Sequence, residues 1–176
     1  MKEEGPGLVQ VYTGDGKGKT TAALGLALRA AGHGLRTYIG QFMKGQEYGE
    51  LEAVNRLRPL ITIEQFGQPG FVHVKSATPE DMALARTGLE RVRQVLHSGK
   101  YDIVVMDEIN VALFFELLTV DEVLSIIESR PPGVELVLTG RRVPDEIIAH
   151  ADLVTEMREI KHPFRKGIKA RRGIEY

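Results

Sequence analysis

One stretch near the start of the chain, residues 9–31, constrains the fold more than any other. Its consecutive parts are Val9-Gln10-Val11-Tyr12, Thr13-Gly14-Asp15-Gly16-Lys17-Gly18-Lys19-Thr20-Thr21, and a run rich in Ala and Leu that ends at Ala31. A β-branched and aromatic strand therefore leads into a glycine-rich turn, and the turn leads into a helix. That order of elements is the context in which a phosphate-binding loop occurs.

The residue types of this loop suit a bound triphosphate. Glycines at alternate positions let backbone N–H groups turn inward without a clash at Cβ, and the positive end of the helix dipole adds to the anion site. Lys19 supplies a charge for the outer phosphates, and the Thr20 hydroxyl is placed to ligate Mg²⁺. The strict pattern has glycine where this chain has Thr13. The alternative interpretation is therefore a glycine-rich turn that only caps the helix.

Composition narrows the function classes. The chain has 176 residues, 43% of them hydrophobic, which predicts a single domain over residues 1–176. A net charge of -1 gives no general case for nucleic acid, and the absence of cysteine excludes disulfides and thiol catalysis. The start reads as no signal peptide, and the apolar runs are too short to span a bilayer, so we expect a cytoplasmic protein without a membrane partner.

The last nineteen residues differ in charge from the rest, with seven Lys or Arg against two Glu from Arg158 to Tyr176. A basic tail of this kind is often solvated or disordered. It could also meet a polyanion such as a nucleotide phosphate. The sequence alone leaves both interpretations open.

Apolar strands alternate with helical segments along the chain. The expected strands are Val9–Tyr12, Arg36–Phe42, Leu60–Phe66, Tyr101–Met106, Val134–Thr139 and Leu153–Met157. The expected helices are one that ends at Ala31, Glu50–Leu57, one from Thr78 to about His97, one from Thr119 to about Ser129, and Pro144–His150. Continuous apolar strands indicate burial on both faces. The pattern predicts a doubly wound, mostly parallel α/β sheet with a nucleotide at the carboxyl ends of its strands.

Two acids, Asp107 and Glu108, follow the apolar strand Tyr101–Met106. Downstream of a phosphate-binding loop this is the Walker B arrangement, in which an acid holds Mg²⁺ directly or through water. An acid that only caps the next helix is the alternative. Asn110 is expected on the same loop.

Together these motifs resemble the P-loop ATP:corrinoid adenosyltransferases, the enzymes that make adenosylcobalamin. The resemblance covers nearly the whole chain. It is carried by residues 13–23, by Gly32-His33-Gly34 with Gln41-Phe42-Met43-Lys44-Gly45, by Val105-Met106-Asp107-Glu108, and by a tail with Lys161-His162-Pro163-Phe164, Gly167, Lys169-Ala170 and Gly173-Ile174-Glu175-Tyr176.

The resemblance implies a P-loop NTPase fold of the RecA-like type, a homodimer, and ATP with Mg²⁺ or Mn²⁺. It also implies a corrinoid substrate whose cobalt an electron-donating reductase brings to Co(I). Cobalt then attacks C5′ of the ribose and tripolyphosphate leaves. Co(I) is already a strong nucleophile, so the enzyme needs no general base. It has to position C5′ and stabilise charge on the leaving group.

The same resemblance implies site residues. Those for ATP are Gly14, Asp15, Gly16, Lys17, Gly18, Lys19, Thr20, Thr21 and Arg29. Those for catalysis are Lys19, Thr20 and Glu108, and those for the metal are Thr20 and Glu108, with Asp107 beside them or one shell further out. Those for the corrinoid are Phe71 and His73.

Three features depart from the family pattern. Family members often have Phe-x-Trp where this chain has Phe71-Val72-His73, and often Asn where it has Asp15. Longer members carry an N-terminal helix over the corrinoid, whereas about eight residues precede the first strand here. Two other functions are compatible with the loop: a kinase or ATPase that uses Arg141 or Arg142 at the γ-phosphate, and a non-catalytic nucleotide switch. Neither explains the tail.

Overall fold

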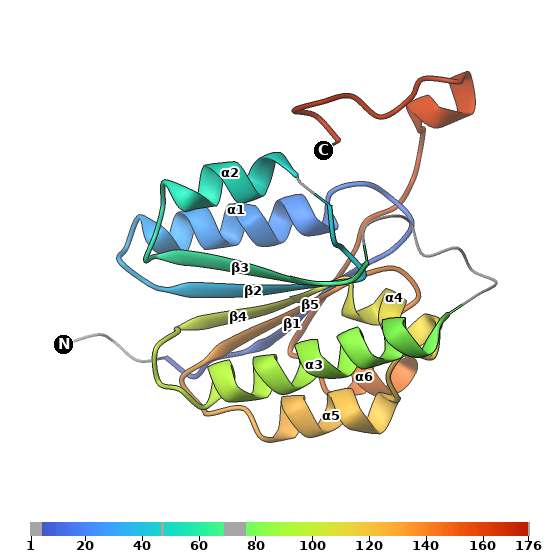
Figure 1. Cartoon of the computed structure of the whole chain (residues 1–176). Helices are drawn as coiled ribbons and strands as arrows, with labels where there is room; N and C mark the ends of the chain where they lie inside the picture. The colour runs from blue at the N-terminus through green and yellow to red at the C-terminus, as the bar shows by residue number, and fades with distance from the viewer. Residues whose placement is uncertain (1–4, 47, 69–76, 176) are drawn as a thin grey trace.

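A single parallel sheet forms the centre of the computed structural model, which describes residues 5–46, 48–68 and 77–175. The strand order is β3-β2-β4-β5-β1-β6, and every pair of neighbours is parallel (Figure 1). The strands are β1 Val9–Thr13, β2 Thr37–Phe42, β3 Ile61–Phe66, β4 Ile103–Asp107, β5 Glu135–Thr139 and β6 Leu153–Glu156. This order confirms the predicted doubly wound sheet of a P-loop NTPase. It also places β5 between the loop strand β1 and the acid-bearing strand β4.

Helices cover both faces of the sheet (Figure 1). One face carries α1 Lys19–Ala31 and α2 Gly49–Asn55, and the other carries α3 Pro79–Leu96, α4 Ile109–Phe114, α5 Val120–Glu128 and α6 Asp145–Ala149. A short 3₁₀ helix, Pro163–Lys166, lies in the tail that follows β6. Among the helices of the described ranges, none combines the length and apolar character that a membrane span requires.

The central strands contribute side chains to two apolar layers, one on each side of the sheet. In β4, Val104 and Met106 pack toward α3, α4 and α5, whereas Val105 packs toward α1. All five residues of β4 are buried, so the continuous apolar run was the correct signal for a strand covered on both faces. Strand β6 differs, because all four of its residues are exposed. It is an edge strand whose one neighbour among the described strands is β1, and the prediction of burial on both faces is wrong for it.

Helices α3 and α5 begin at the capping residues from which the sequence predicts a helix start. Thr78 accepts a hydrogen bond from the backbone of Asp81 and the Asp81 carboxylate bonds back, which makes a capping box before α3. Thr119 and Glu122 do the same for α5. Helix α4 differs, because its N-cap residue is Glu108 and no side chain forms a capping hydrogen bond there. The expectation that Asn110 lies on a loop is therefore wrong: it lies in α4 and is buried.

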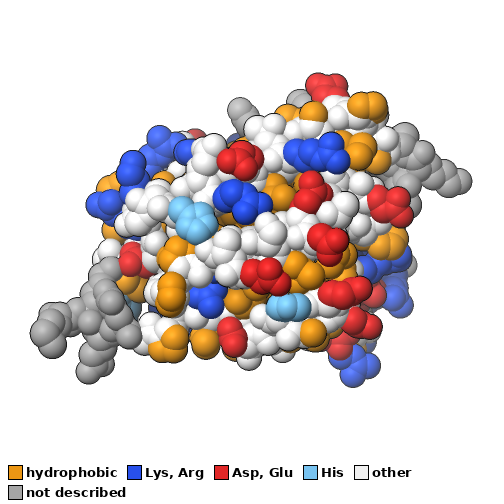
Figure 2. All heavy atoms as spheres, turned by 90° about the horizontal axis from the view of Figure 1, so that it is seen from below, with side chains coloured by type: hydrophobic (Ala, Val, Ile, Leu, Met, Phe, Trp, Pro, Cys, Tyr) orange, Lys and Arg blue, Asp and Glu red, His pale blue; other side chains and the backbone are white. Residues whose placement is uncertain are grey.

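Basic and acidic side chains are interspersed on the face that carries α3 and α5. Figure 2 shows Lys and Arg separated by Asp and Glu across the described residues of this face. A binding surface for nucleic acid is a basic patch or stripe on one face. The described residues of this face therefore present both signs of charge rather than one.

Candidate active site

The glycine-rich loop spans the gap between the end of β1 and the start of α1. Gly14 and Gly18 have φ angles of 93° and 126°, which are conformations that glycine adopts at little cost. The Gly16 N–H donates to the carbonyl oxygen of Met157 at 2.7 Å, and a Cβ added to Gly16 would come within 2.7 Å of that same oxygen. The loop is therefore braced by the segment that follows β6, and this contact leaves no room for a side chain.

Lys19 lies inside the loop rather than pointing into solvent. Its Nζ donates to the carbonyl oxygens of Gly14 at 2.6 Å and Gly16 at 2.7 Å, and the residue is only 7% exposed. Burial lowers the pKa of Lys19, and nearby Arg141 lowers it further, while the acids around the site oppose both. The ammonium is thus centred on the loop, facing whatever anion the loop encloses.

Asp107, at the end of β4, is fully buried and accepts four hydrogen bonds. Thr20 Oγ1 and Thr139 Oγ1 donate to its Oδ1 at 2.9 and 2.7 Å. Gln41 Nε2 and Lys44 Nζ donate to its Oδ2 at 3.2 and 2.8 Å. Two carboxylate oxygens offer about four lone-pair positions, so this set uses all of them. Asp107 would have to release a donor before it could ligate a metal directly.

Glu108 stands beside Asp107 in a different setting. Its φ of 61° is in the left-handed region, and its N–H donates to Thr139 Oγ1 at 2.9 Å. The turn places Glu108 on the lining of the cavity, whereas Asp107 remains beneath it. Burial and the charge of Asp107 raise the pKa of Glu108, while Lys44, Lys19 and Arg141 oppose the rise.

Lys44 was not predicted as a site residue, although it lies in the Gln41–Gly45 segment that carried the family resemblance. It follows Met43, whose φ of 58° turns the chain at the end of β2. Its ammonium forms an ion pair with Asp107 at 2.8 Å and lies 5.4 Å from the centre of the Tyr48 ring. Burial works against the charged form, but the charges of Asp107, Glu108 and Glu50 together raise the pKa of Lys44.

These groups surround a cavity of about 680 Å³ at the carboxyl edge of the sheet, the edge where the sequence predicts the nucleotide. Its volume lies within the range typical of small-molecule sites. Its lining comes from the loop and α1, the segment after β2, the ends of β4 and β5, and the tail: Gly16, Lys17, Gly18, Lys19, Thr20, Thr21, Leu24, Lys44, Gln46, Tyr48, Gly49, Glu50, Glu108, Arg141, His162, Ala170, Gly173, Ile174 and Glu175.

The basic tail rises from the body of the domain and turns back above α1 (Figure 1). Most of its residues are exposed, but its end contacts the loop. Lys17 Nζ donates to the carbonyl oxygen of Ile174 at 2.9 Å and to the carboxylate of Glu175 at 3.2 Å. Arg171 also pairs with Glu175, at 3.0 Å. The last turn of the tail therefore lies against the same loop that faces the cavity.

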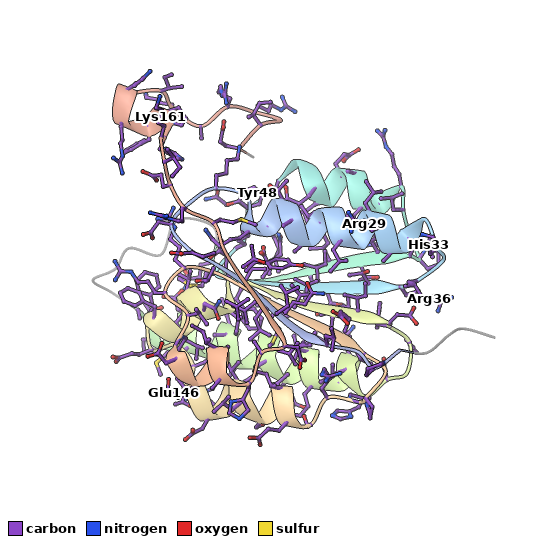
Figure 3. All side chains as sticks on the ribbon, turned by 180° about the vertical axis from the view of Figure 1, so that it is seen from behind. Arg29, His33, Arg36, Tyr48, Glu146 and Lys161 are labelled. Carbon is purple, nitrogen blue, oxygen red and sulfur yellow. The ribbon has the colours of Figure 1, made fainter. Side chains whose placement is uncertain are left out.

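Arg29, predicted as an ATP contact, lies apart from these groups. It is exposed in the last turn of α1, roughly 15 Å along the helix axis from Lys19. Figure 3 shows it toward the His33 end of α1, whereas Tyr48 lies nearer the end below the tail that carries Lys161. The cavity reaches along α1 only to Leu24. The two residues predicted for the corrinoid, Phe71 and His73, lie outside the described residues.

The donor set fits a hard divalent cation. Thr20 and Glu108 bring a hydroxyl and a carboxylate to the lining, and Asp107 hydrogen-bonds the same hydroxyl. Oxygen ligands are those that Mg²⁺ and Mn²⁺ prefer. In the described part of the chain no three His, Cys, Asp or Glu side chains gather as metal ligands. Phosphate oxygens would complete the coordination, as is usual for Mg²⁺.

Comparison with known proteins agrees with this geometry. The family model for ATP:corrinoid adenosyltransferase BtuR/CobO/CobP matches residues 5–176. A corrinoid adenosyltransferase of Sinorhizobium sp is 38% identical over 99% of this chain and 83% of its own length, and one of Escherichia coli K12 is 36% identical over 97% and 86%. The corrinoid adenosyltransferase CobA of Salmonella typhimurium is 37% identical over 99% and 88%. The chain therefore belongs to the ATP:corrinoid adenosyltransferase family.

Proposed function

We propose that this corrinoid adenosyltransferase holds the triphosphate of ATP in the loop of residues 14–20 and presents C5′ of the ribose to Co(I) of a corrinoid. The observation that carries the proposal is the position of Lys19, whose ammonium is enclosed by the loop carbonyls at 2.6 and 2.7 Å. A buried charge that donates to carbonyl oxygens is suited to exchange them for phosphate oxygens, which carry full negative charge.

The reaction requires the protein to stabilise negative charge on the leaving tripolyphosphate and to position C5′. Co(I) gives an electron pair to C5′, the C5′–O bond breaks, and its electrons leave on tripolyphosphate. Lys19 counters the growing charge from inside the loop, and Lys17 does so from its rim. No proton has to move at C5′, so Asp107 and Glu108 are not needed as general bases. Their role is to bind and orient.

The metal assignments follow from the two different settings of the acids. We propose that Thr20 and Glu108 hold Mg²⁺ or Mn²⁺, and that Asp107 orients Thr20 through the 2.9 Å hydrogen bond. The bound ion would add Lewis-acid charge to the leaving phosphates. Thr139 fixes both acids at once, because it donates to Asp107 and accepts from the backbone of Glu108.

Other parts of the assignment rest on the family resemblance together with features of the surface. We propose that Arg29 contacts ATP, that Phe71 and His73 contact the corrinoid, and that a reductase supplies the electron in the cytoplasm. For the homodimer, the support is β6, an edge strand with Leu153 and Val154 exposed at 40% and 42%. An exposed strand edge is a template for pairing with another chain.

The test is an anaerobic reaction of the protein with MgATP and chemically reduced Co(I)alamin, followed by the light-sensitive Co–C spectrum and by analysis of the phosphate product. We expect adenosylcobalamin and tripolyphosphate in equal amounts. A protein that released ADP and formed no Co–C bond would instead be a γ-phosphate enzyme. Arg141, which lines the cavity, would then be the residue to examine.

A further inference from the structure

The Lys44 ammonium lies beside two residues of the proposed metal site. Its Nζ is 2.8 Å from Asp107 Oδ2 and 3.5 Å from Thr20 Oγ1. These are the two residues that also bond to each other at 2.9 Å. The ammonium therefore lies beside the hydroxyl proposed as a metal ligand and on the carboxylate that orients it.

The local charge balance explains why a cation is needed there. The side chain of Asp107 has no exposed surface, and that of Lys44 is only 15% exposed. A carboxylate buried without a counter-charge is strongly unfavourable, and Glu108 adds a second negative charge next to it. The Lys44 ammonium supplies this counter-charge, 2.8 Å from Asp107 Oδ2.

The same arrangement conflicts with a bound divalent ion. An ion on Thr20 and Glu108 would lie within a few ångströms of the Lys44 ammonium, and like charges at such distances repel strongly in a partly buried site. Lysine has a flexible stem, and Lys44 lines the cavity, so its head has space to move. A triphosphate in that cavity would offer it new anionic partners.

We propose that Lys44 is a resident counter-cation that holds the metal position in the nucleotide-free protein and is displaced into the cavity when the divalent ion binds. This inference rests on the proposed function for the use of a divalent metal. It predicts that Lys44 competes with the metal, so that removing its charge strengthens metal binding. A purely structural ion pair predicts the opposite, because its loss would leave the ligands less well held.

The experiment measures Mn²⁺ binding by electron paramagnetic resonance in the absence of nucleotide. We expect Lys44→Met to bind Mn²⁺ at least about tenfold more tightly than the unaltered protein, because no ammonium has to leave. Lys44→Gln, which keeps a hydrogen-bond donor for Asp107, should show the same direction and serves if the Met variant does not fold. The control is Arg91→Met, which removes the 2.9 Å ion pair with Glu64 and should leave the Mn²⁺ affinity unchanged.

Thermal melts give a second measurement. In EDTA, Lys44→Met should melt below the unaltered protein, and Mn²⁺ should raise its melting temperature more than that of the unaltered protein or of Arg91→Met. Mn²⁺ affinity that is equal or weaker in both Lys44 variants would overturn the inference. If the unaltered protein binds Mn²⁺ and the Lys44 variants bind it more tightly, but no adenosylcobalamin forms, the proposed function fails and the inference about Lys44 stands.

Discussion

Replacing Asp107 with asparagine tests how much the buried network at the end of β4 contributes to stability. The amide oxygen of Asn can still accept from Thr20 and Thr139, but its NH₂ group would face Gln41 and Lys44, which both donate to the carboxylate. The Gln41 amide and the Lys44 ammonium, which are both hydrogen-bond donors, would then face the NH₂ group, which is also a donor. Gln41 can respond by rotating its amide, whereas the Lys44 ammonium has no acceptor of its own to offer.

The expected decrease in the free energy of unfolding follows from the loss of one partner of a buried ion pair, which typically costs 3–5 kcal/mol. The side chain of Lys44 is 15% exposed and borders the cavity, so part of its charge can regain water. We therefore expect a loss of about 3 kcal/mol, at the low end of that range. For a chain of this length that corresponds to a fall in melting temperature of roughly 6–12 °C.

The assay is urea denaturation in EDTA, with the free energy of unfolding compared for the unaltered protein, Asp107→Asn, Lys44→Met and the double variant. Because the two single changes each leave one charge without its partner, the double variant should be more stable than their sum predicts. A loss below about 1 kcal/mol for Asp107→Asn, or strict additivity in the double variant, would refute the reasoning, since such values are typical of surface ion pairs.

Three further changes test the site. Lys19→Ala should reduce turnover by a factor that corresponds to about 2–4 kcal/mol, because a preorganised charge on the leaving group is lost; a near-normal rate in the Co(I) assay would exclude that role. Glu108→Gln should raise the Mg²⁺ concentration needed for half-maximal activity with little change in melting temperature, and an unchanged midpoint would argue against a ligand. Gly16→Ala should weaken ATP binding in calorimetry and lower the melting temperature, because its Cβ would collide with the Met157 carbonyl; normal affinity would show that the loop can shift.

The sequence predicted those features that depend on local chemistry. The loop, its strand and its helix occur where the glycines and Lys19 require them, and the capping boxes begin α3 and α5 as expected. What was missed depends on strand order, which no local pattern reveals. Thr139 and Gln41 contact Asp107 only because β5 and β2 flank β4 in the sheet.

The same reason applies to Lys44 and the tail. A lysine in a polar loop and a basic tail both resemble solvent-exposed segments. Nothing near Lys44 in sequence shows that Asp107 attracts it, and nothing near Glu175 shows that Lys17 does. Lys17 and Glu175 are 158 residues apart, so their contact exists only in the folded chain. The position of Arg29 relative to bound ATP stays a prediction.

The bracing of the glycine-rich loop by the segment after β6 bears on how the chain is synthesised. The loop leaves the ribosome well before Met157 and the tail that complete its surroundings. Residues are added at about 5–20 per second, so the loop waits roughly 7–28 s for Met157 and longer for the tail. A nascent or truncated chain that lacks them offers ATP only an unsupported loop. Capacity to bind nucleotide should therefore arise only after the tail has been synthesised, and a pulse of ATP should protect a chain that contains the tail from proteolysis far better than a product that lacks it.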